Sequence, residues 1–574
     1  MSSHATKPNP SPLRLWPAIA LLAILWVLRF LPRFVEDPSI ELLMTAFMAP
    51  LVCAGLILIW WVAASRATWR ERVFGLLGFL ALLVIGFFVG DATIRGFGTL
   101  SVVQWAASAF VVGLVGSRWI RPDRRTAVGL VAVALTCGYW ALIRMDGVWG
   151  GDFKAERSWR WSRTAEDDYL AAREGSTGVA SLDEPLAEAE WPGFRGPGRD
   201  GVVPGLTLAE DWQARPPREL WRIQVGPGWS SFAVAGRRIF TQEQRGEFEA
   251  VVAYDTENGA ELWAYEYRSR FFEAMGGVGP RATPTLAGGM LFTLGAEGFL
   301  HRLEPETGKV VWQADLRVES QREPPTWGFS SSPLVVDDVV IVHAGGEGDR
   351  GVLAYGVDDG RLRWGAPAGG NTYSSPQLSR VAGEDSVPMI TDEGLTLYDP
   401  ADGSVIWKHD WRINNYRVLQ PLVVDESTLL ISTGQGVGTR RLDLRRDGAG
   451  LSVEVRWTSR GMKPDFNDYT AHEGSLYGFD PSILACIDLE TGERRWKGGR
   501  YGAGQLLLLP DASQLLVVGE RGDLVLVRAT PERHEELTRM KVFEAKTWNH
   551  PALVGDRLYL RNAQEAVALA MPLG

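Results

Sequence analysis

The stretch AYDTENGAELW at 253–263 decides the fold, because variants of it return through the C-terminal part of the chain. Each copy places a turn that ends in Gly shortly before a Trp. The other copies are RLEPETGKVVW (302–312), AYGVDDGRLRW (354–364), LYDPADGSVIW (397–407), CIDLETGERRW (486–496) and a stretched copy that ends at Trp457. The spacing averages about 46 residues, and Trp221 in ELWRIQV carries the same Trp without the first half of its unit. A period of this length is typical of a repeat architecture.

Each repeat unit predicts several short strands. The apolar run SSPLVVDDVVIVHAGG (331–346) leads through a turn to GVLAYGVDDG (351–360) and then to the strand that holds the Trp. Asp-Gly, Asn-Gly and Thr-Gly steps mark hairpin turns between such runs. Four short strands in roughly 40–50 residues are typical of a propeller blade. The large apolar Trp is expected to pack between neighbouring blades.

The strand runs that open the units predict eight blades. They begin near Trp229, Arg281, Ser330, Tyr373, Tyr416, Asp468, Gly502 and Trp548. The seventh unit, which includes VLVRATPERHEELTRMKV (525–542), keeps the pattern of a blade but lacks the Trp. The eighth lacks its last strand because EAVALAMPLG (565–574) ends the chain. The strand around Trp221 is expected to supply it and close the ring, so the sequence predicts an all-β, eight-bladed propeller over 191–574.

The repeat resembles the pyrroloquinoline-quinone (PQQ) repeat of a propeller family. Further motifs carry the resemblance: WPGFRGPGRDG (191–201), GPGWSSFAV (226–234), TWGFSSSP (326–333) and ERGDLVLVRATPE (520–532). The family includes quinoprotein alcohol and sugar dehydrogenases and the outer-membrane assembly propeller lipoproteins, so the resemblance implies the fold more specifically than an activity. In the dehydrogenases PQQ, Ca²⁺ and a catalytic Asp lie at the top face of the ring, which makes PQQ and Ca²⁺ the cofactors to consider here.

A membrane domain is expected at 15–145. Five apolar stretches, each close to the roughly 20 residues that cross a bilayer, lie at about 15–31, 41–64, 73–90, 99–117 and 127–144. The Arg residues gather in the loops at 65–72 and 118–125, which the positive-inside rule places in the cytoplasm. The N-terminal residues 1–14 are then cytoplasmic, and five spans deliver the C-terminal region to the periplasm. This layout, five spans before a propeller, is similar to that of membrane-bound quinoprotein glucose dehydrogenase.

Composition and charge narrow the classes further. A chain of 574 residues with 46% hydrophobic and 22% charged residues is folded rather than disordered, and the 24 Trp residues fit a repeated position. Three Cys residues without a C-x-x-C pair offer neither a disulfide framework nor a zinc site. Residues 1–150 carry a formal charge of +6 and the remainder −16, so the propeller is a poor nucleic-acid binder. Residues 146–190 are expected to be a polar linker with one short helix at about 164–175.

The segments that enter the innermost strands supply the candidate site, because they cross the top face beside the central channel. They are rich in Asn, Ser, Tyr, Trp, Arg and His, and a converging polar and aromatic rim suits a small-molecule site. Arg281 or Arg417 could hold carboxylates, and Trp229, Trp327 or Trp548 could stack on a planar ring, with Tyr373 beside them. Oxygens for Ca²⁺ could come from Asn415, Asn467 and Asp468, and a general base from Asp468 or His472. The alternative is that these residues satisfy backbone groups and seal the ring.

Several features of the sequence argue against a catalytic function. The vicinal Cys pair of the alcohol dehydrogenases is missing, since the propeller holds only Cys486, and no family site residue can be carried over by alignment. The G-x-G-x-x-G matches at 196–201 and 346–351 open no helix, so they do not indicate a dinucleotide site.

Three functions remain open. The favoured one is a membrane-anchored, periplasm-facing module that binds a small molecule or a periplasmic protein at its top face, since fold does not dictate function. The second is a PQQ-dependent dehydrogenase that oxidises an alcohol or sugar and passes electrons to membrane quinone. The third is a sensor or transporter accessory.

Overall fold

The protein is described by a computed structural model that covers residues 12–35, 40–95, 97–149, 155–174, 182–434, 436–447 and 450–574. It divides into two compact units. A helical unit holds Met1–Val148 and Ala155–Ser162, and a propeller unit holds Trp149–Lys154 and Arg163–Gly574. Most of the predicted cytoplasmic segment 1–14, together with residues 150–154 and 175–181 of the predicted linker, lies outside the described residues.

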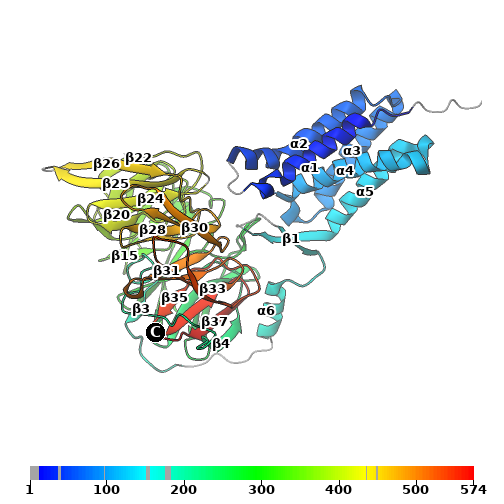
Figure 1. Cartoon of the computed structure of the whole chain (residues 1–574). Helices are drawn as coiled ribbons and strands as arrows, with labels where there is room; N and C mark the ends of the chain where they lie inside the picture. Colours follow the sequence, from blue (N-terminus) through cyan, green and yellow to red (C-terminus); the bar gives the residue numbers. More distant parts are fainter. Residues whose placement is uncertain are drawn as a thin grey trace, which may run out of the picture. The chain divides into compact units, whose positions relative to one another are not determined.

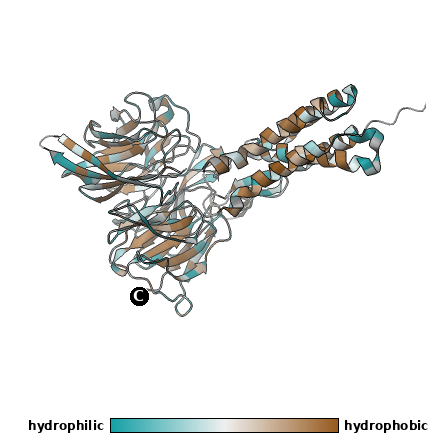
Figure 2. Ribbon diagram, turned by 45° about the horizontal axis from the view of Figure 1, so that its top comes forward, coloured by the Kyte–Doolittle hydropathy of each residue, from teal (hydrophilic) through white to brown (hydrophobic). Residues whose placement is uncertain are grey.

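The helical unit contains five apolar helices and three short 3₁₀ turns within the described residues. The helices are α1 (Trp16–Phe30), α2 (Ile40–Ala63), α3 (Trp69–Val89), α4 (Phe97–Ile120) and α5 (Arg125–Leu142), and the turns are η1 (Leu31–Phe34), η2 (Ala92–Ile94) and η3 (Pro122–Arg124). A two-stranded hairpin of β1 (Ile143–Val148) and β2 (Ala155–Trp159) completes it. Figure 2 shows the predominantly hydrophobic colouring of these helices.

The prediction of five membrane spans is wrong by one within the described residues. Four helices are long and apolar enough to cross a membrane: Met44–Ala63, Trp69–Val89, Gly98–Trp119 and Arg125–Leu142. Helix α1 has 15 residues, which at about 1.5 Å per residue reach only about 22 Å, less than the roughly 30 Å of a hydrocarbon core. The apolar run at its C-terminal end passes into η1 instead of extending the α-helix.

Both Arg-rich connections lie at one end of the helical unit. Arg125 Nε, at the start of α5, lies 2.8 Å from Glu71 Oε1 in the first turn of α3, and Thr68 and Glu71 form a capping box there. The start of α1 is at this end too, because Arg14 N–H donates to Ser65 O at 3.1 Å. The β1–β2 hairpin is at the other end, where Arg160 donates to the carbonyl oxygen of Val89.

The propeller has eight blades, as the sequence predicts. Figure 1 labels strands from several of these blades. Blade 1 contains β3 (Ala189–Trp191), β5 (Ala233–Ala235), β6 (Arg238–Arg245), β7 (Phe248–Asp255) and β8 (Glu261–Arg268). Blade 2 contains β11 (Thr285–Ala287), β12 (Met290–Leu294), β13 (Phe299–Leu303) and β14 (Val310–Asp315). Blade 3 contains β15 (Leu334–Val336), β16 (Val339–His343), β17 (Val352–Gly356) and β18 (Leu362–Ala366). Blade 4 contains β19 (Ser379–Val381), β20 (Glu384–Thr391), β21 (Gly394–Tyr398) and β22 (Val405–Asp410).

Blade 5 contains β23 (Leu422–Asp425), β24 (Thr428–Thr433), β25 (Gly438–Asp447) and β26 (Gly450–Ser459). Blade 6 contains β27 (Tyr469–His472), β28 (Ser475–Phe479), β29 (Ile483–Asp488) and β30 (Arg494–Arg500). Blade 7 contains β31 (Gln505–Leu509), β32 (Gln514–Val518), β33 (Asp523–Arg528) and β34 (Glu536–Lys541). Blade 8 joins β35 (Ala552–Val554), β36 (Arg557–Arg561) and β37 (Glu565–Ala570) to β4 (Arg218–Gln224). Ala568 pairs with Trp221 in this sheet, which confirms the predicted closure of the ring. The remaining short elements are β9 (Phe272–Glu273), β10 (Gly277–Val278), α7 (Leu316–Ser320) and η4 (Pro510–Ala512).

The repeated Trp of one blade packs against the repeated Gly of the next blade. The indole N–H of Trp263 donates to Pro305 O of the next blade at 2.9 Å, and a Cβ on Gly308 would lie 2.4 Å from the same ring. Gly308 has φ +71°, a left-handed conformation that favours glycine. The same Trp-to-Gly contact recurs between Trp221 and Gly259, Trp312 and Gly360, Trp364 and Gly403, and Trp457 and Gly492. The predicted position of the Trp between blades is therefore confirmed.

A leading segment, residues 191–206, crosses the inner strands of the ring. It bonds to blade 2 through Leu286 N–H and Pro192 O at 2.7 Å, and to blade 7 through Val203 N–H and Leu508 O at 2.8 Å. It also reaches blade 3, because Arg199 Nη1 donates to Pro333 O at 2.7 Å. These bonds connect distant blades through the centre, so the segment fills part of the channel.

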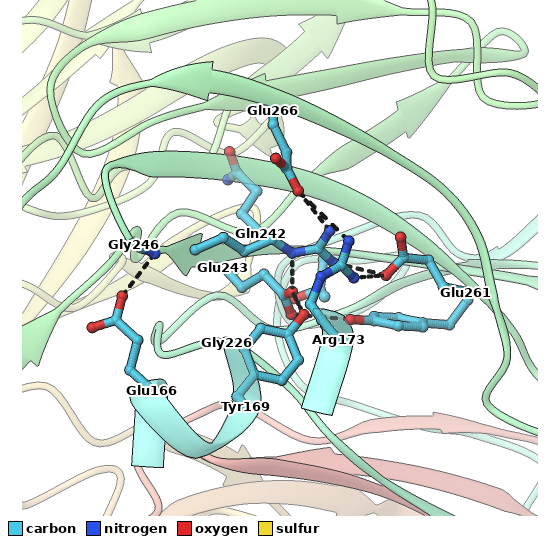
Figure 3. A network of polar contacts seen from close by, with 12 residues as sticks. Glu166, Tyr169, Arg173, Gly226, Gln242, Glu243, Gly246, Glu261 and Glu266 are labelled. Carbon is cyan, nitrogen blue, oxygen red and sulfur yellow. Dashed lines mark hydrogen bonds and ion pairs between the residues drawn. The ribbon is translucent and has the colours of Figure 1, made fainter. Parts of the chain in front are cut away.

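The predicted short helix of the linker is present as α6 (Ala165–Glu174), but it belongs to the propeller unit rather than to a free linker. Figure 3 shows the network that holds it against blade 1. Tyr169 O–H donates to Glu243 Oε1 at 2.6 Å, and Glu243 is fully buried beside Arg245 Nε at 2.7 Å. Arg173 of α6 pairs with Glu261 on β8. The propeller unit therefore begins well before residue 191, the boundary that the repeat pattern predicts.

Candidate functional site

The segments that enter the innermost strands surround a cavity of about 200 Å³ at one face of the ring. We call this face the cavity face; the hairpin turns that follow the innermost strands lie at the opposite face. Residues from all eight entering segments line the cavity, together with Phe194 from the leading segment. Its walls carry two groups of aromatic rings, and its floor carries a buried ion network.

The first aromatic group comes from blades 3 to 5 and is called the rim cluster: Trp327, Tyr373 and Tyr416. The Trp327 ring centroid lies 4.1 Å from that of Tyr416 and 5.1 Å from that of Tyr373. The Tyr373 hydroxyl accepts the backbone N–H of Trp327 at 3.3 Å, which ties neighbouring entering segments together. The rings are partly exposed, and Asn415 next to them is exposed. The cluster therefore offers rigid aromatic surface at the mouth.

The second aromatic group contains Trp229, Trp548 and Phe466. The ring centroid of Trp548 lies 4.9 Å from that of Trp229 and 5.0 Å from that of Phe466. Lys546 Nζ lies 4.0 Å from the Trp548 ring centroid and 5.2 Å from that of Trp229, and it donates to Met275 O at 3.0 Å. This wall thus already holds an ammonium group of the chain in cation–π contact.

The floor is an ion network of Arg195, Asp468 and His550. Arg195 Nε lies 3.3 Å from Asp468 Oδ1, and His550 Nε2 contacts Asp468 Oδ2. All three side chains are at most 6% exposed. Burial raises the pKa of the Asp468 carboxyl, but the charges of Arg195 and His550 outweigh it and hold that pKa below its usual value. Asp468 is therefore an ionised, paired carboxylate, which does not suit a general base.

Two further acidic residues line the cavity, one paired with an arginine and the other without a charged partner among the described residues. Glu273, in the β9–β10 insertion between blades 1 and 2, pairs with Arg281 Nη2 at 3.0 Å. Burial lowers the pKa of Arg281, and Glu273 offsets part of this effect. Asp465 has no hydrogen bond or ion pair to its carboxylate among the described residues, and burial raises its pKa to about 6.

The structure brings six of the ten predicted site residues to the cavity. These are Trp229, Arg281, Trp327, Tyr373, Asp468 and Trp548. The other four do not line it. Arg417 is fully buried and donates to the carbonyl oxygens of Thr391 and Trp411.

Local bonds hold the three remaining predicted residues. Asn415 is exposed on the rim, with its side-chain oxygen accepting the backbone N–H of Tyr416. Asn467 accepts from Asp465 N–H and donates to Pro481 O. His472 lies on β27 with Nε2 2.9 Å from Ser513 Oγ. The interpretation as local structural residues therefore fits these positions better than a ligand role.

Sequence reasoning missed five residues of the cavity that carry charge or aromatic surface. They are Arg195, Glu273, Tyr416, Asp465 and His550. His550 and Tyr416 stand in entering segments and Arg195 in the motif WPGFRGPGRDG, so position alone could have proposed them. The pairing of Arg195 with Asp468 spans 273 residues and has no local signal.

The cavity residues fit PQQ and Ca²⁺ poorly. PQQ is an anion with several carboxylates, whereas Arg281 and His550 already face Glu273 and Asp468, and Asp465 would repel it. Asn467 and Asp468, the predicted Ca²⁺ ligands, are committed to protein partners. No group of three or more His, Cys, Asp or Glu that could hold a metal ion occurs within the described ranges. The volume is also below the roughly 300–1,000 Å³ of cofactor-sized pockets.

Fold and cavity together define an eight-bladed PQQ-repeat propeller in which Asp468 and Glu273, two of the acidic residues of the cavity, are paired with charged side chains of the same chain. The chain belongs to the family described as outer membrane protein assembly factor BamB, whose model matches residues 212–323 and 276–498. It is 25% identical over 378 residues to that factor of Shewanella oneidensis, covering 62% of this chain and 88% of the relative. The factor of Yersinia pestis is 22% identical over 356 residues, with 59% and 76% covered.

Two solved structures are also similar to the chain. BamB from Moraxella catarrhalis has 15% identity and a TM-score of 0.44, covering 62% of this chain and 98% of that chain. A quinohemoprotein alcohol dehydrogenase from Comamonas testosteroni has 12% identity and a TM-score of 0.46, covering 71% and 84%.

Proposed function

We propose that the protein is a membrane-anchored propeller that binds a protein partner through its cavity face. One observation carries the proposal: the mouth bears a preorganised aromatic cluster, while Arg195, Asp468 and His550 beneath it pair with one another. Trp and Tyr at the centre of a surface are the residue types that dominate protein–protein affinity. Relatives named as outer membrane protein assembly factors agree with a protein partner.

The propeller is placed on the periplasmic side of the inner membrane in this proposal. The positive-inside rule assigns the Arg-rich end of the helical unit to the cytoplasm. Helix α5 starts at that end and the β1–β2 hairpin follows at the other, so the periplasmic assignment of the propeller is the same whether or not α1 crosses the membrane. The N-terminus is assigned to the cytoplasm because Arg14 bonds to Ser65 at the Arg-rich end.

Cysteine labelling tests this topology. The three native cysteines are buried, so single exposed cysteines can be introduced as Arg121→Cys in the α4–α5 connection and Asp338→Cys in a propeller turn. A membrane-impermeant maleimide added to cells with a permeabilised outer membrane should label only the second. Labelling of Arg121→Cys alone would reverse the proposed orientation.

Photo-crosslinking in cells tests the binding function. Benzoylphenylalanine is placed at Asn414 or Thr326, both exposed beside the rim cluster, and at Asp338, exposed on the β15–β16 turn at the opposite face. We expect discrete protein adducts from the two rim positions and none from the turn. Equal adducts from both faces, or adducts from the turn alone, would refute a cavity-face interaction.

The dehydrogenase alternative is not advanced, because no observation of the cavity favours it over a binding role. Its predicted charged and amide residues either pair with protein charges or lie away from the cavity, and its predicted aromatic residues line the surface that a binding role uses equally well. Electron transfer to membrane quinone and a sensor role likewise have no supporting contact within the described residues.

A further inference from the structure

One arginine at the cavity face is fixed in position by uncharged partners. Arg440 is the third residue of β25. The hairpin turns of a blade alternate between the two faces, so the β24–β25 turn just before it lies at the cavity face. Its Nε donates to Thr458 Oγ1 at 2.9 Å, and its Nη1 donates to His409 Nε2 at 3.1 Å. The guanidinium carbon lies 4.2 Å from the ring centroid of Trp411. Contacts from blades 4 and 5 therefore hold this side chain in one orientation.

The outer edge of the Arg440 guanidinium is left for a ligand. An arginine side chain carries five N–H groups, and the bonds to Thr458 and His409 use two of them, so three have no acceptor among the described residues. The residue is partly exposed. Nη1 and Nη2 form the fork that binds a carboxylate through two parallel hydrogen bonds. Because the fork is already ordered, a carboxylate would bind there at little cost in side-chain entropy.

A second guanidinium contacts the same indole. The guanidinium carbon of Arg417 lies 4.9 Å from the ring centroid of Trp411, and its Nη groups donate to the carbonyl oxygens of Thr391 and Trp411. Arg417 is fully buried, so it cannot itself reach a ligand. No ion pair joins Arg417 or Arg440 to a carboxylate among the described residues. Two like charges on one ring repel each other, and an anion at the outer edge of Arg440 would offset that repulsion.

The charged side chains next to this pair leave an excess of one positive charge. Glu393 is taken by Lys408 at 2.8 Å and by Arg412 at 3.8 Å. The whole group contains four cations and three carboxylates: Arg417, Arg440, Lys408, Arg412, Glu393, Asp392 and Asp410. One excess charge matches a single carboxylate, whereas a phosphate monoester with about two negative charges would need a second reachable cation.

We propose that Arg440 binds the carboxylate of an acidic side chain that the protein partner presents to the cavity face. This inference rests on the proposed protein-binding function and names the chemistry that this part of the face recognises. Asn414 is exposed and lies three residues after Trp411, which limits the distance between their Cα atoms to about 11 Å. A partner that reaches Arg440 therefore comes close to a photo-crosslinker at Asn414.

The test uses the full-length chain in cells, with benzoylphenylalanine at Asn414. The readout is the yield of the protein adduct, normalised to the abundance of the chain. Arg440→Gln removes the charge and the fork and should reduce the yield about tenfold, because charge-assisted hydrogen bonds are lost. Arg440→Lys keeps the charge without the fork and should give an intermediate yield.

The matched control is Arg456→Gln. Arg456 lies on the neighbouring strand β26 and pairs with Glu490 at 2.9 Å, so its loss should leave the yield unchanged. An equal reduction in the two Gln variants, or no reduction in Arg440→Gln, would overturn the inference. 

Salt dependence separates a charge contact from a structural role of Arg440. Cells with a permeabilised outer membrane are irradiated in about 0.05 M and about 0.5 M NaCl, which shortens the Debye length from about 14 Å to about 4 Å. The yield of the chain with native Arg440 should fall several-fold at the higher salt concentration, and the yield of Arg440→Gln should change little. The same salt dependence in both proteins would contradict a contact between Arg440 and a carboxylate.

Charge exchange then locates the carboxylate in the partner. Mass spectrometry of the Asn414 adduct identifies the crosslinked surface of the partner, and each Asp and Glu on it is replaced by Lys. Arg440→Glu should abolish the adduct, and one of these replacements should restore it. Failure of every replacement, or an adduct with phospholipid in place of protein, would contradict the inference. An Asn414 adduct that forms but does not respond to Arg440→Gln refutes the carboxylate contact alone, whereas the absence of any rim adduct refutes the protein-binding function as well.

Discussion

Replacing Asp468 by Asn should destabilise the propeller by about 3 kcal/mol. Breaking a buried ion pair by removing one partner typically costs about 3–5 kcal/mol because the other charge stays buried. Asp468 faces two such groups, Arg195 and His550, and all three are at most 6% exposed. The lower end of the range applies because Arg195 keeps its hydrogen bond to Asp200 O at 2.8 Å.

The assay is urea unfolding of the full-length protein in detergent, followed by Trp fluorescence. With a slope of about 3 kcal/mol per molar urea, which suits a large β domain, the midpoint of Asp468→Asn should fall by about 1 M. The control Asp358→Asn breaks a pair in which the carboxylate is 91% exposed, so it should shift the midpoint by less than about 0.3 M. Equal shifts in both variants, or no shift in Asp468→Asn, would refute the account of the floor.

The pH dependence of this effect has a defined sign. The pKa of Asp468 is lowered in the folded protein, so its contribution is present above the unfolded value of about 4 and is lost as pH falls through the folded pKa. The difference between the native chain and Asp468→Asn should therefore persist at pH 5 and shrink below pH 4. A difference that grows on acidification would contradict an ionised Asp468.

Three further substitutions test the frame around the cavity. Tyr169→Phe removes the hydrogen bond to buried Glu243, which should destabilise the docking of α6 by about 1.5–3 kcal/mol. Hydrogen exchange of the α6 amides should therefore become at least about tenfold faster. Unchanged exchange would mean that the network does not hold α6. Gly403→Ala adds a Cβ 2.4 Å from the Trp364 ring and should lower the free energy of unfolding in urea by about 3 kcal/mol. The control Gly383→Ala also has a positive φ, +85°, but its Cβ would meet open space, so it should lower that free energy by only about 1 kcal/mol. Equal losses in the two variants would contradict the role of packing against the Trp. Trp221→Ala should lower stability by about 3–5 kcal/mol, measured in the same way, and a smaller loss than about 1 kcal/mol would show that ring closure does not depend on it.

The ring was predictable because its signals are local and repeated. The turn that ends in Gly308 contacts Trp263 of the preceding blade, and the same contact recurs around the ring. A single sequence motif therefore predicts blade order, blade number and closure at Trp221. The length of α1 was less predictable, since an apolar run cannot show where an α-helix gives way to a 3₁₀ turn.

The cavity was predictable in place but not in chemistry. Entering segments had to meet at one face, which brought Trp327 and Asp468 to the cavity as expected. Whether a side chain points inward or bonds to its own loop depends on long-range geometry, so the sequence could not show that Arg417 and His472 do not line the cavity. The partner of Asp468, Arg195, comes from a segment that threads the channel, and no spacing in the sequence reports that contact.

The most direct test of the central claim is the crosslinking yield from Asn414 in cells after the rim cluster is truncated. In the double variant Trp327→Ala and Tyr416→Ala, loss of about 2 kcal/mol of contact energy should reduce the partner adduct at least about tenfold. Leu362→Ala, an exposed truncation on the outer strand of blade 3, should leave the yield unchanged. An undiminished adduct in the double variant, with the protein at normal abundance, would contradict binding through the cavity face.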